Sequence, residues 1–332
     1  MMDLTNKDII QWGLEYLSSH GYTLKSNQPE DVQIRPWSYV VRFSTSDGFI
    51  YLKQTPKLIA LEATITKMLR NQFDAPVPEV IASNPVLDCF LMKDAGNPLR
   101  PILKKQFDAA LLCKAVDEFT TMQLAVAKKV DVFIKIGVPD FQLHKLPDLY
   151  KELILKKDVL ISDGLTEKEM DELALSVQIV SDLCKKLSEY AIPQTLVQPD
   201  FHDNNALIDD SLQKITIIDL GEIVISHPFF SLINFLDQIK KHHGLTEKDS
   251  AYQIIQKACF KNFTQFESSE NLLKVFELAR ILLPIYGVLA SYRLIEACDK
   301  TELTEFYGVG KLRDELRECI ATCKEKGASY VR

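Results

Sequence analysis

The fold is decided by the stretch TLVQPDFHDNNALI, residues 195–208, and by KITIIDLGE, residues 214–222, which follows closely. Each stretch begins with a short apolar run and reaches an aspartate, Asp200 in the first and Asp219 in the second. Asn205 comes five positions after Asp200. A charge at the end of a buried strand is costly unless a cation or a metal accompanies it. The two stretches therefore predict short strands that are followed by two acids and an amide, with a role in binding a cation or in catalysis.

The order of these three side chains is typical of one kind of chemistry. Kinase-type phosphoryl transfer uses an acid to orient the acceptor hydroxyl, and an amide and a second acid to hold magnesium against the nucleotide phosphates. Asp200, Asn205 and Asp219 supply these groups in that order.

A strand lysine and a helix glutamate lie earlier in the chain. The runs 39–43 and 49–53 flank a polar turn at 44–48 and predict a β-hairpin, with Lys53 at the end of its second strand. Apolar residues at helical spacing predict a helix over 58–71 that contains Glu62. Both side chains could be merely solvated. Their position ahead of the two acidic stretches favours a phosphate-binding lysine braced by a carboxylate.

The remaining pattern predicts a small strand-rich part followed by a larger helical part. The boundary is set by Gly96 and Pro98, after which no long strand pattern appears before residue 195. We therefore expect an α+β fold of two lobes, an antiparallel-sheet lobe over residues 1–94 and a mainly helical lobe over 95–332. The other expected elements are a helix over Thr5–Ser19, strands at 79–82 and 89–92, and helices over 107–128, over 166–190 with a capping box of Thr166 and Glu169, from Thr246 with Asp249, and over 271–298.

The chain resembles the aminoglycoside phosphotransferase and choline kinase family in the order of Lys53, Glu62, residues 90–92, Asp200 with Asn205, and Asp219. The fold of that family is similar to that of protein kinases. The resemblance implies that Asp200 orients or deprotonates the acceptor hydroxyl and that Asn205 and Asp219 bind Mg²⁺. It further implies that Lys53 contacts the ATP phosphates and that Glu62 holds Lys53. The linker at Phe90, Leu91 and Met92 would then offer backbone groups to adenine.

The chain departs from the family pattern at three places. Gln198 stands where the family has a histidine two positions before the acid, and Pro199 replaces a glycine. A glutamine can still hydrogen-bond to neighbouring backbone and so keep the loop geometry. Downstream, only Pro228 and Leu232 remain of the family's usual turn. The expected phosphate loop, residues 34–38, contains no glycine, so its amides cannot approach phosphates as closely as those of a glycine-rich loop.

Bulk properties narrow the function classes. A chain of 332 residues with a net charge of −7 predicts two lobes and argues against a broad nucleic-acid surface, which needs clustered Lys and Arg. No apolar run is long enough for a membrane span, and the first residues do not form a signal peptide. Seven scattered cysteines are expected to be free buried thiols, although Cys319 and Cys323, one helical turn apart, also fit a metal site. The protein is therefore expected in the cytoplasm.

The sequence thus predicts a kinase that transfers the ATP γ-phosphoryl group to a hydroxyl of a small molecule such as an aminoglycoside, an amino alcohol or a sugar. The alternative is a kinase-like binding protein without turnover. A metal-dependent hydrolase using Asp200, His202 and Asp203 is a weaker alternative, because no second cluster supports it. Glu222 could face the acceptor or only cap its loop, and His227 is expected to be structural.

Overall fold

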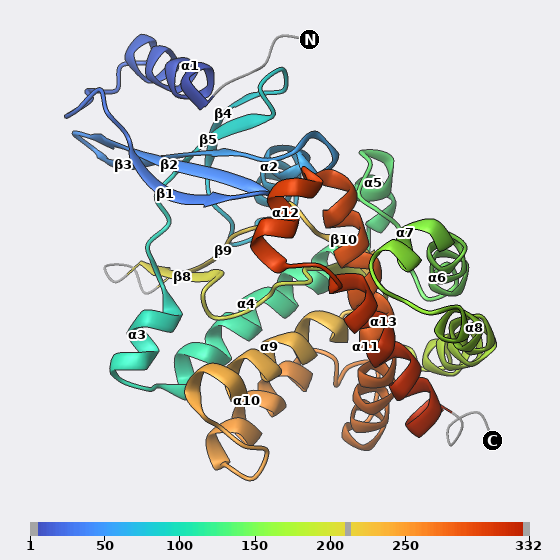
Figure 1. Ribbon diagram of the computed structural model, residues 1–332. Coiled ribbons are helices and arrows are strands. Elements are labelled where there is room, and N and C mark those ends of the chain that lie inside the picture. Colours follow the sequence, from blue (N-terminus) through green and yellow to red (C-terminus); the bar gives the residue numbers. More distant parts are fainter. Residues whose placement is uncertain (1–5, 210–213, 328–332) are drawn as a thin grey trace.

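The computed structural model describes residues 6–209 and 214–327, and its first part is a five-stranded antiparallel sheet (Figure 1). The order across the sheet is β1-β2-β3-β5-β4, which leaves β1 at one edge. In the predicted hairpin, Val40 lies opposite Lys53. The strands are β1 (Glu30–Arg35), β2 (Ser38–Thr45), β3 (Gly48–Gln54), β4 (Val80–Asn84) and β5 (Cys89–Lys93). The prediction of an α+β class with an antiparallel first part is confirmed.

Helix α1 (Asn6–Ser19) covers one face of this sheet and closes a small core. Ile9 and Leu17 are buried there against sheet side chains that include Leu52. Gly13 makes the close approach possible, because a Cβ at this position would lie only 2.8 Å from the side chain of Leu52. The predicted helix is confirmed over the described residues.

Helix α2 (Glu62–Phe73) connects the sheet to the rest of the molecule. Its buried residues Ile65 and Leu69 belong to the large core of the helical part and not to the core of the sheet. The helix starts later than predicted, because Lys57–Ile59 form a separate 3₁₀ turn, η1. Glu62 is therefore in the first turn of a helix whose buried side chains are anchored in the core of the helical part.

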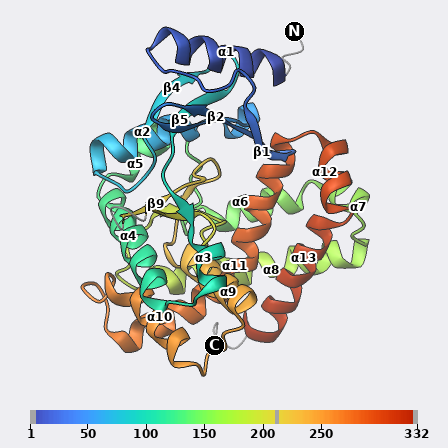
Figure 2. The same cartoon turned by 90° about the vertical axis from the view of Figure 1, so that its left-hand side faces the viewer.

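The second part of the molecule is mainly helical and surrounds one large apolar core (Figure 2). Among the described residues, none of the helices combines the length and the apolar composition that a membrane span requires. The helices are α3 (Leu99–Lys105), α4 (Ala109–Ala127), α5 (Val130–Lys135), α6 (Leu146–Ile154), α7 (Lys157–Ser162), α8 (Glu167–Ser188), α9 (Phe229–His243), α10 (Ser250–Lys261), α11 (Ser269–Ala297), α12 (Lys300–Tyr307) and α13 (Lys311–Thr322), with a π-helical turn η2 (Cys323–Gly327).

Most of the predicted helix starts agree with the structure. The capping box is present at α8, where Thr166 accepts from the Glu169 backbone and the Glu169 carboxylate accepts from the Thr166 backbone. The predicted start at Thr246 is wrong. Its backbone N–H and hydroxyl both donate to the Asp249 carboxylate, which makes a turn, and α10 begins only at Ser250. The proposed cap Thr5 lies outside the described residues.

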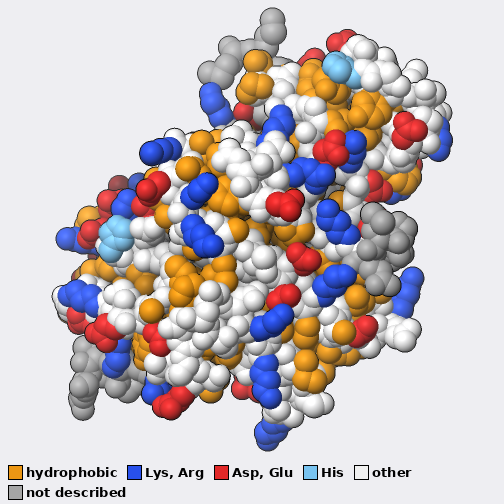
Figure 3. Space-filling model, turned by 180° about the vertical axis from the view of Figure 1, so that it is seen from behind, with side chains coloured by type: hydrophobic (Ala, Val, Ile, Leu, Met, Phe, Trp, Pro, Cys, Tyr) orange, Lys and Arg blue, Asp and Glu red, His pale blue; other side chains and the backbone are white. Residues whose placement is uncertain are grey.

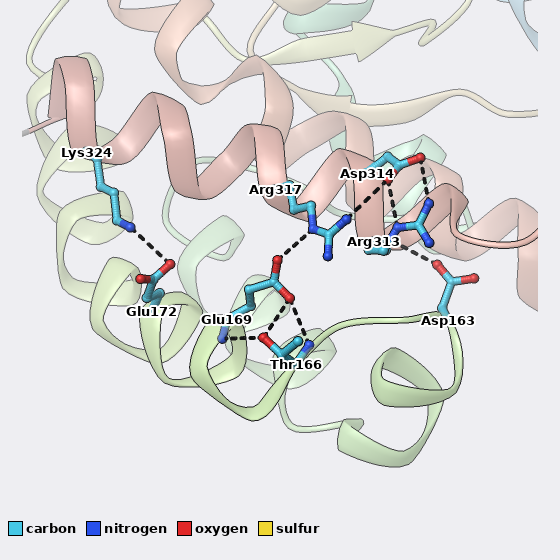
Figure 4. A network of polar contacts seen from close by, with 8 residues as sticks. All are labelled: Asp163, Thr166, Glu169, Glu172, Arg313, Asp314, Arg317 and Lys324. Carbon is cyan, nitrogen blue, oxygen red and sulfur yellow. Dashed lines mark hydrogen bonds and ion pairs between the residues drawn. The ribbon is translucent and has the colours of Figure 1, made fainter.

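Helix α13 is tied to the start of α8 by a polar network (Figure 4). Arg317 Nε donates to Glu169 Oε1 at 2.6 Å, and Lys324 pairs with Glu172 at 3.0 Å. The Asp163 carboxylate accepts from the backbone N–H of Arg313 at 2.8 Å. These contacts fix α13 and η2 against the start of α8, and with them the residues that come directly before α13.

The surface and the cysteines agree with the expectations from composition. On the face seen in Figure 3, Lys and Arg are interspersed with Asp and Glu and are not gathered by sign. All seven cysteines are free, and five of them are buried. Cys319 and Cys323 pack in the large core, which favours a helix face over the metal site left open above.

Two small sheets carry the acidic stretches to the cleft. β7 (Thr195–Val197) pairs with β10 (Val224–Ser226), and β8 (Ala206–Asp209) pairs with β9 (Lys214–Ile217) and with β6 (Asn97–Pro98). The linker from the first sheet runs directly over this hairpin at Gly96, where a side chain would collide with the Ile208 carbonyl group. The linker and the acidic loops are therefore held against each other.

Candidate active site

Lys53 joins the sheet part to the helical part through two carboxylates. Its Nζ lies 2.7 Å from Glu62 Oε2 and 2.6 Å from Asp219 Oδ1. The Lys53 and Glu62 side chains are almost fully buried, whereas that of Asp219 is 40% exposed and faces open space. Burial acts to lower the pKa of Lys53, but the two carboxylates outweigh it and raise that pKa. The lysine predicted from a strand end is thus a charged, fixed group in a cleft.

The Asp219 carboxylate is also held in its charged form. Burial acts to raise the pKa of Asp219, but the Lys53 ammonium outweighs it, and the pKa is lowered. Asp219 has a left-handed backbone with a φ of 66°, which is rare outside glycine and asparagine. Such a conformation persists only where its surroundings impose it.

Gln198 supplies part of that constraint. Its Nε2 donates to the backbone carbonyls of Ile218 at 2.9 Å and Asp219 at 2.8 Å. Its own backbone is held on both sides by the Ser231 hydroxyl, which accepts from Gln198 N and donates to Gln198 O, each at 2.8 Å. The glutamine in place of a histidine does hydrogen-bond to nearby backbone, as the sequence predicted, and the structure adds that this backbone belongs to the second acidic loop.

Asn205 lies at the same end of the β8–β9 hairpin as Asp219. The backbone carbonyl of Asn205 accepts from Ile218 N at 3.0 Å, one residue before Asp219. The Asn205 side-chain nitrogen donates to the Asp200 carbonyl at 2.9 Å. Asn205 is therefore bonded directly to the backbone of Asp200 and to that of Ile218, the residue before Asp219, so the three predicted residues lie close together.

Asp200 is exposed and held from one side only. Its side chain is 60% exposed, and His202 Nε2 lies 3.2 Å from Oδ2. His202 Nδ1 accepts from Asn204 N at 3.2 Å, so the ring proton is on Nε2 and donates to Asp200. This arrangement leaves Asp200 Oδ1 for a substrate group.

Asp203 points away from this site. Its carboxylate is fully buried and accepts from Arg100 Nε at 2.8 Å and from His243 Nε2 at 2.7 Å. The weaker alternative of a hydrolase metal bound by Asp200, His202 and Asp203 is therefore wrong, because Asp203 is committed to a separate ion pair.

A cleft of about 330 Å³ opens in front of Asp200 and Asp219. Glu222 lines it as well, which settles the open alternative for this residue in favour of a cleft-facing position. Burial, followed by the charges of Asp219 and Asp200, raises the pKa of Glu222 to about 7. The rest of the wall is mostly aromatic, aliphatic or small, with Asn234 and Ser291 as polar members and Lys311 as a cation; it is made by Trp37, Pro199, Asn234, Leu283, Tyr286, Gly287, Ala290, Ser291, Leu294, Tyr307 and Lys311.

The predicted adenine-contacting backbone is displaced. Phe90, Leu91 and Met92 lie inside β5, which is paired with β3 on one edge and β4 on the other. Their peptide groups are committed to the sheet and are not free for a base. The linker proper begins after Lys93. Asp94 N donates to Phe49 O at 3.2 Å and Gly96 N donates to Asp94 Oδ1 at 3.0 Å, so within residues 94–96 the candidates are the backbone carbonyls and the Ala95 N–H.

The search of solved structures finds matches over nearly the whole chain. An aminoglycoside 2'-phosphotransferase IIIa variant solved with GDP has 15% identity and a TM-score of 0.59, covering 96% of this chain and 99% of that chain. Amicoumacin kinase, solved with AMP-PNP and Ca²⁺, has 15% identity and a TM-score of 0.56, with 96% and 93% covered. The ethanolamine kinase of Plasmodium vivax has 10% identity and a TM-score of 0.54, with 89% and 82% covered.

The chain has the protein-kinase-like fold of these phosphotransferases. At the level of sequence, neither a family model nor a curated protein matches it. The resemblance inferred from a few residues is thus confirmed at the level of the fold.

Three contacts of the site in this kinase-like fold were not predicted from the sequence. His202 contacts Asp200, Ser231 clamps the Gln198 backbone, and Trp37 lines the cleft from a turn that was expected to serve phosphates. The sequence singled out His202 only as a metal ligand of the hydrolase alternative, although its place two positions after Asp200 also allows the contact. The other two depend on contacts between segments far apart in the chain.

Glu222 gives the fold a measurable pH dependence. Because the folded protein holds this proton up to a pH of about 7 while an unfolded glutamate loses it near 4.5, stability falls as the pH rises between these values. We expect Glu222→Gln to gain stability over the wild type across this window, by roughly 1–3 kcal/mol above pH 7. Urea unfolding at several pH values measures it. A difference between the two proteins that is the same at pH 4 and pH 8 would contradict the assignment.

Proposed function

We propose that the protein is a magnesium-dependent phosphotransferase that moves the γ-phosphoryl group of ATP to a hydroxyl of a small molecule. The observation that carries the proposal is the contact of Lys53 with Asp219 at 2.6 Å, beside a cleft that Asp200 also lines. The fold is shared with proteins named as phosphotransferases and kinases. Residues 1–94 would form the nucleotide-binding lobe, and residues 95–332 the lobe with the catalytic loops and the acceptor cleft.

The residues present fit Mg²⁺. This ion prefers oxygen ligands and binds through one or two carboxylates together with substrate phosphates. Asp219 has one carboxylate oxygen on Lys53 and a side chain that remains 40% exposed. Asn205 has its nitrogen occupied by the Asp200 carbonyl, which leaves its oxygen for the ion. Magnesium bound here with ATP would neutralise the charge that develops on the phosphates.

The protein's own groups would act mainly by positioning. Lys53, held between Glu62 and Asp219, would contact the nucleotide phosphates. Asp200 would accept a hydrogen bond from the acceptor hydroxyl, and its proton as the new bond forms. His202 would keep the Asp200 carboxylate turned toward the cleft by donating from Nε2. The backbone of residues 94–96 would contact the base.

The cleft favours an acceptor that carries a positive charge beside its hydroxyl. Asp200 and Asp219 line it with carboxylates, Glu222 adds a carboxyl group whose pKa is raised to about 7, and aromatic rings form part of its wall. The cation Lys311 also lines it, but its charge is paired with Glu315 at 2.8 Å. Carboxylates and ring faces both attract an ammonium group. An aminoglycoside, an amino alcohol or an amino sugar therefore fits better than a neutral sugar.

The direct test is an acceptor screen. Purified protein with Mg-ATP is incubated with aminoglycosides, amino alcohols and sugars, and ADP release and a phosphorylated product are measured. We expect turnover with at least one amine-bearing alcohol. Binding of ATP without consumption for any acceptor would favour the alternative, a kinase-like binding protein.

Asp219 gives a test that needs no acceptor. We expect Mg-ATP to raise the thermal midpoint of the wild type, and saturation at 100 times Kd corresponds to about 2.7 kcal/mol. Asp219→Ala should lose this gain, because both the metal ligand and a partner of Lys53 are removed. Each variant is compared with its own nucleotide-free melting curve, and Asp200→Asn is the matched control that should keep the gain. Equal gains in all three proteins would count against the metal role.

A further inference from the structure

The turn between β1 and β2 reaches across to the helical part of the molecule. Pro36 and Trp37 form this two-residue turn, at the place where protein kinases have a glycine-rich loop that covers the nucleotide phosphates. In both Figure 1 and Figure 2, α12 lies beside the end of β1. The contact joins two segments that are more than 260 positions apart in the sequence.

The contact is built from aromatic rings. Trp37 stacks on Tyr307, with ring centroids 5.4 Å apart and planes inclined by 12°. It also meets Phe306 edge-on at 5.0 Å, and the Arg35 guanidinium lies 5.3 Å from the centre of the Phe306 ring. We call Trp37, Phe306 and Tyr307 the aromatic clasp.

The clasp stands at the acceptor cleft. Trp37 and Tyr307 both line the cleft that contains Asp200 and Asp219, whereas Phe306 does not. A tryptophan ring in this position offers no amide nest for phosphates, because the turn has no glycine that would let its backbone come close. The turn therefore contributes to the acceptor side of the site.

The two sides of the clasp are held differently. On the helical side, the Lys311 ammonium lies 4.6 Å from the centre of the Tyr307 ring and pairs with Glu315 at 2.8 Å, so α12 is tied to α13. On the other side, all six residues of the edge strand β1 are exposed. The turn is thus anchored by its rings more than by packing of its own strand.

We propose that Trp37 is a lid over the wall of the acceptor cleft that carries Ala290 and that its docking on Phe306 and Tyr307 controls access to this wall, while Asp200 stays 60% exposed with the rings docked. This inference rests on the proposed function for the identity of the cleft, but the docking can be tested without ATP or acceptor. An aromatic pair contributes about 0.5–1.5 kcal/mol, which corresponds to a roughly 2- to 13-fold change in the ratio of closed to open cleft. Opening of the lid would widen the cleft beside Asp200 for an acceptor.

The test measures access to this wall of the cleft with a cysteine reporter. Ala290 lines the cleft, and Ala290→Cys changes its size little. The rate of N-ethylmaleimide addition at position 290 is followed by peptide mass spectrometry, which separates it from the native cysteines. In this background we compare Phe306→Ala, which loosens Trp37 without removing a cleft wall, with Tyr307→Phe, which keeps the stacked ring.

We expect Phe306→Ala to speed modification at position 290 by about 2- to 13-fold and Tyr307→Phe to leave it unchanged. Trp37→Ala should speed it at least as much and leave the thermal gain from Mg-ATP intact. An unchanged rate at position 290 in a folded Phe306→Ala protein would overturn the lid, and so would a Trp37→Ala variant that loses the Mg-ATP gain alone. If no acceptor is ever phosphorylated, the proposed function fails while the labelling result stands.

Discussion

Asp200→Asn is expected to lower kcat by roughly 10²–10⁴-fold, the usual contribution of a positioned general base. The substitution keeps the size of the side chain and removes the charge that accepts the acceptor proton. The reaction is measured with Mg-ATP and the best acceptor from the screen. The KM for ATP should change little, because Asp200 lies on the acceptor side and contacts neither Lys53 nor Glu62 among the contacts of the described residues.

The control for this result is the folding stability of the Asp200→Asn variant. The Asp200 side chain is 60% exposed and has one contact at 3.2 Å to His202, so Asp200→Asn should cost little stability. Urea unfolding should give nearly the wild-type free energy. Turnover within a few-fold of the wild type would contradict the role of Asp200 as the group that accepts the hydroxyl proton.

The part of the site that the sequence predicts is the part made by local patterns. Lys53 ends a hairpin strand, and Asp219 follows a buried strand, so alternation and burial alone mark them. Glu62 was found because it lies within a helix with a clear apolar face that follows the Lys53 strand. The structure brings both carboxylates to the Lys53 ammonium, that of Glu62 at 2.7 Å and that of Asp219 at 2.6 Å.

The rest of the site depends on pairing and packing that one chain cannot reveal. The sequence predicts a strand at 89–92, and the resemblance implies a linker at 90–92; only the partners on both sides show that the strand is central and that its peptide groups are used in the sheet. Trp37 was assigned to a phosphate loop by position alone. Its contact with Tyr307 follows from the path of α12, a segment for which the sequence predicts only that it belongs to the mainly helical lobe.

The second large effect is expected on stability, at Asp203, three positions after Asp200. Asp203→Ala should cost about 3–5 kcal/mol of unfolding free energy, because it leaves a buried cation without its partner. The Asp203 carboxylate is fully buried between Arg100 and His243, at 2.8 and 2.7 Å. Arg100 retains 16% exposure of its side chain, so water would recover part of the loss and the lower half of the range is more fitting. Chemical unfolding at pH 7 measures the change.

Asp200→Asn and Asp203→Ala together separate chemistry from folding within one loop. The ion pair joins α3, the loop after β7 and the end of α9, so its loss should loosen the loop that carries Asp200. Below the unfolding transition, Asp203→Ala should keep a measurable kcat, whereas Asp200→Asn should keep the fold and lose turnover. The reverse pattern, an unstable Asp200 variant and a stable but inactive Asp203 variant, would mean that the two carboxylates have been assigned the wrong way round. It would also place the reacting group at the carboxylate that is buried between Arg100 and His243, which does not line the cleft of Asp200 and Asp219.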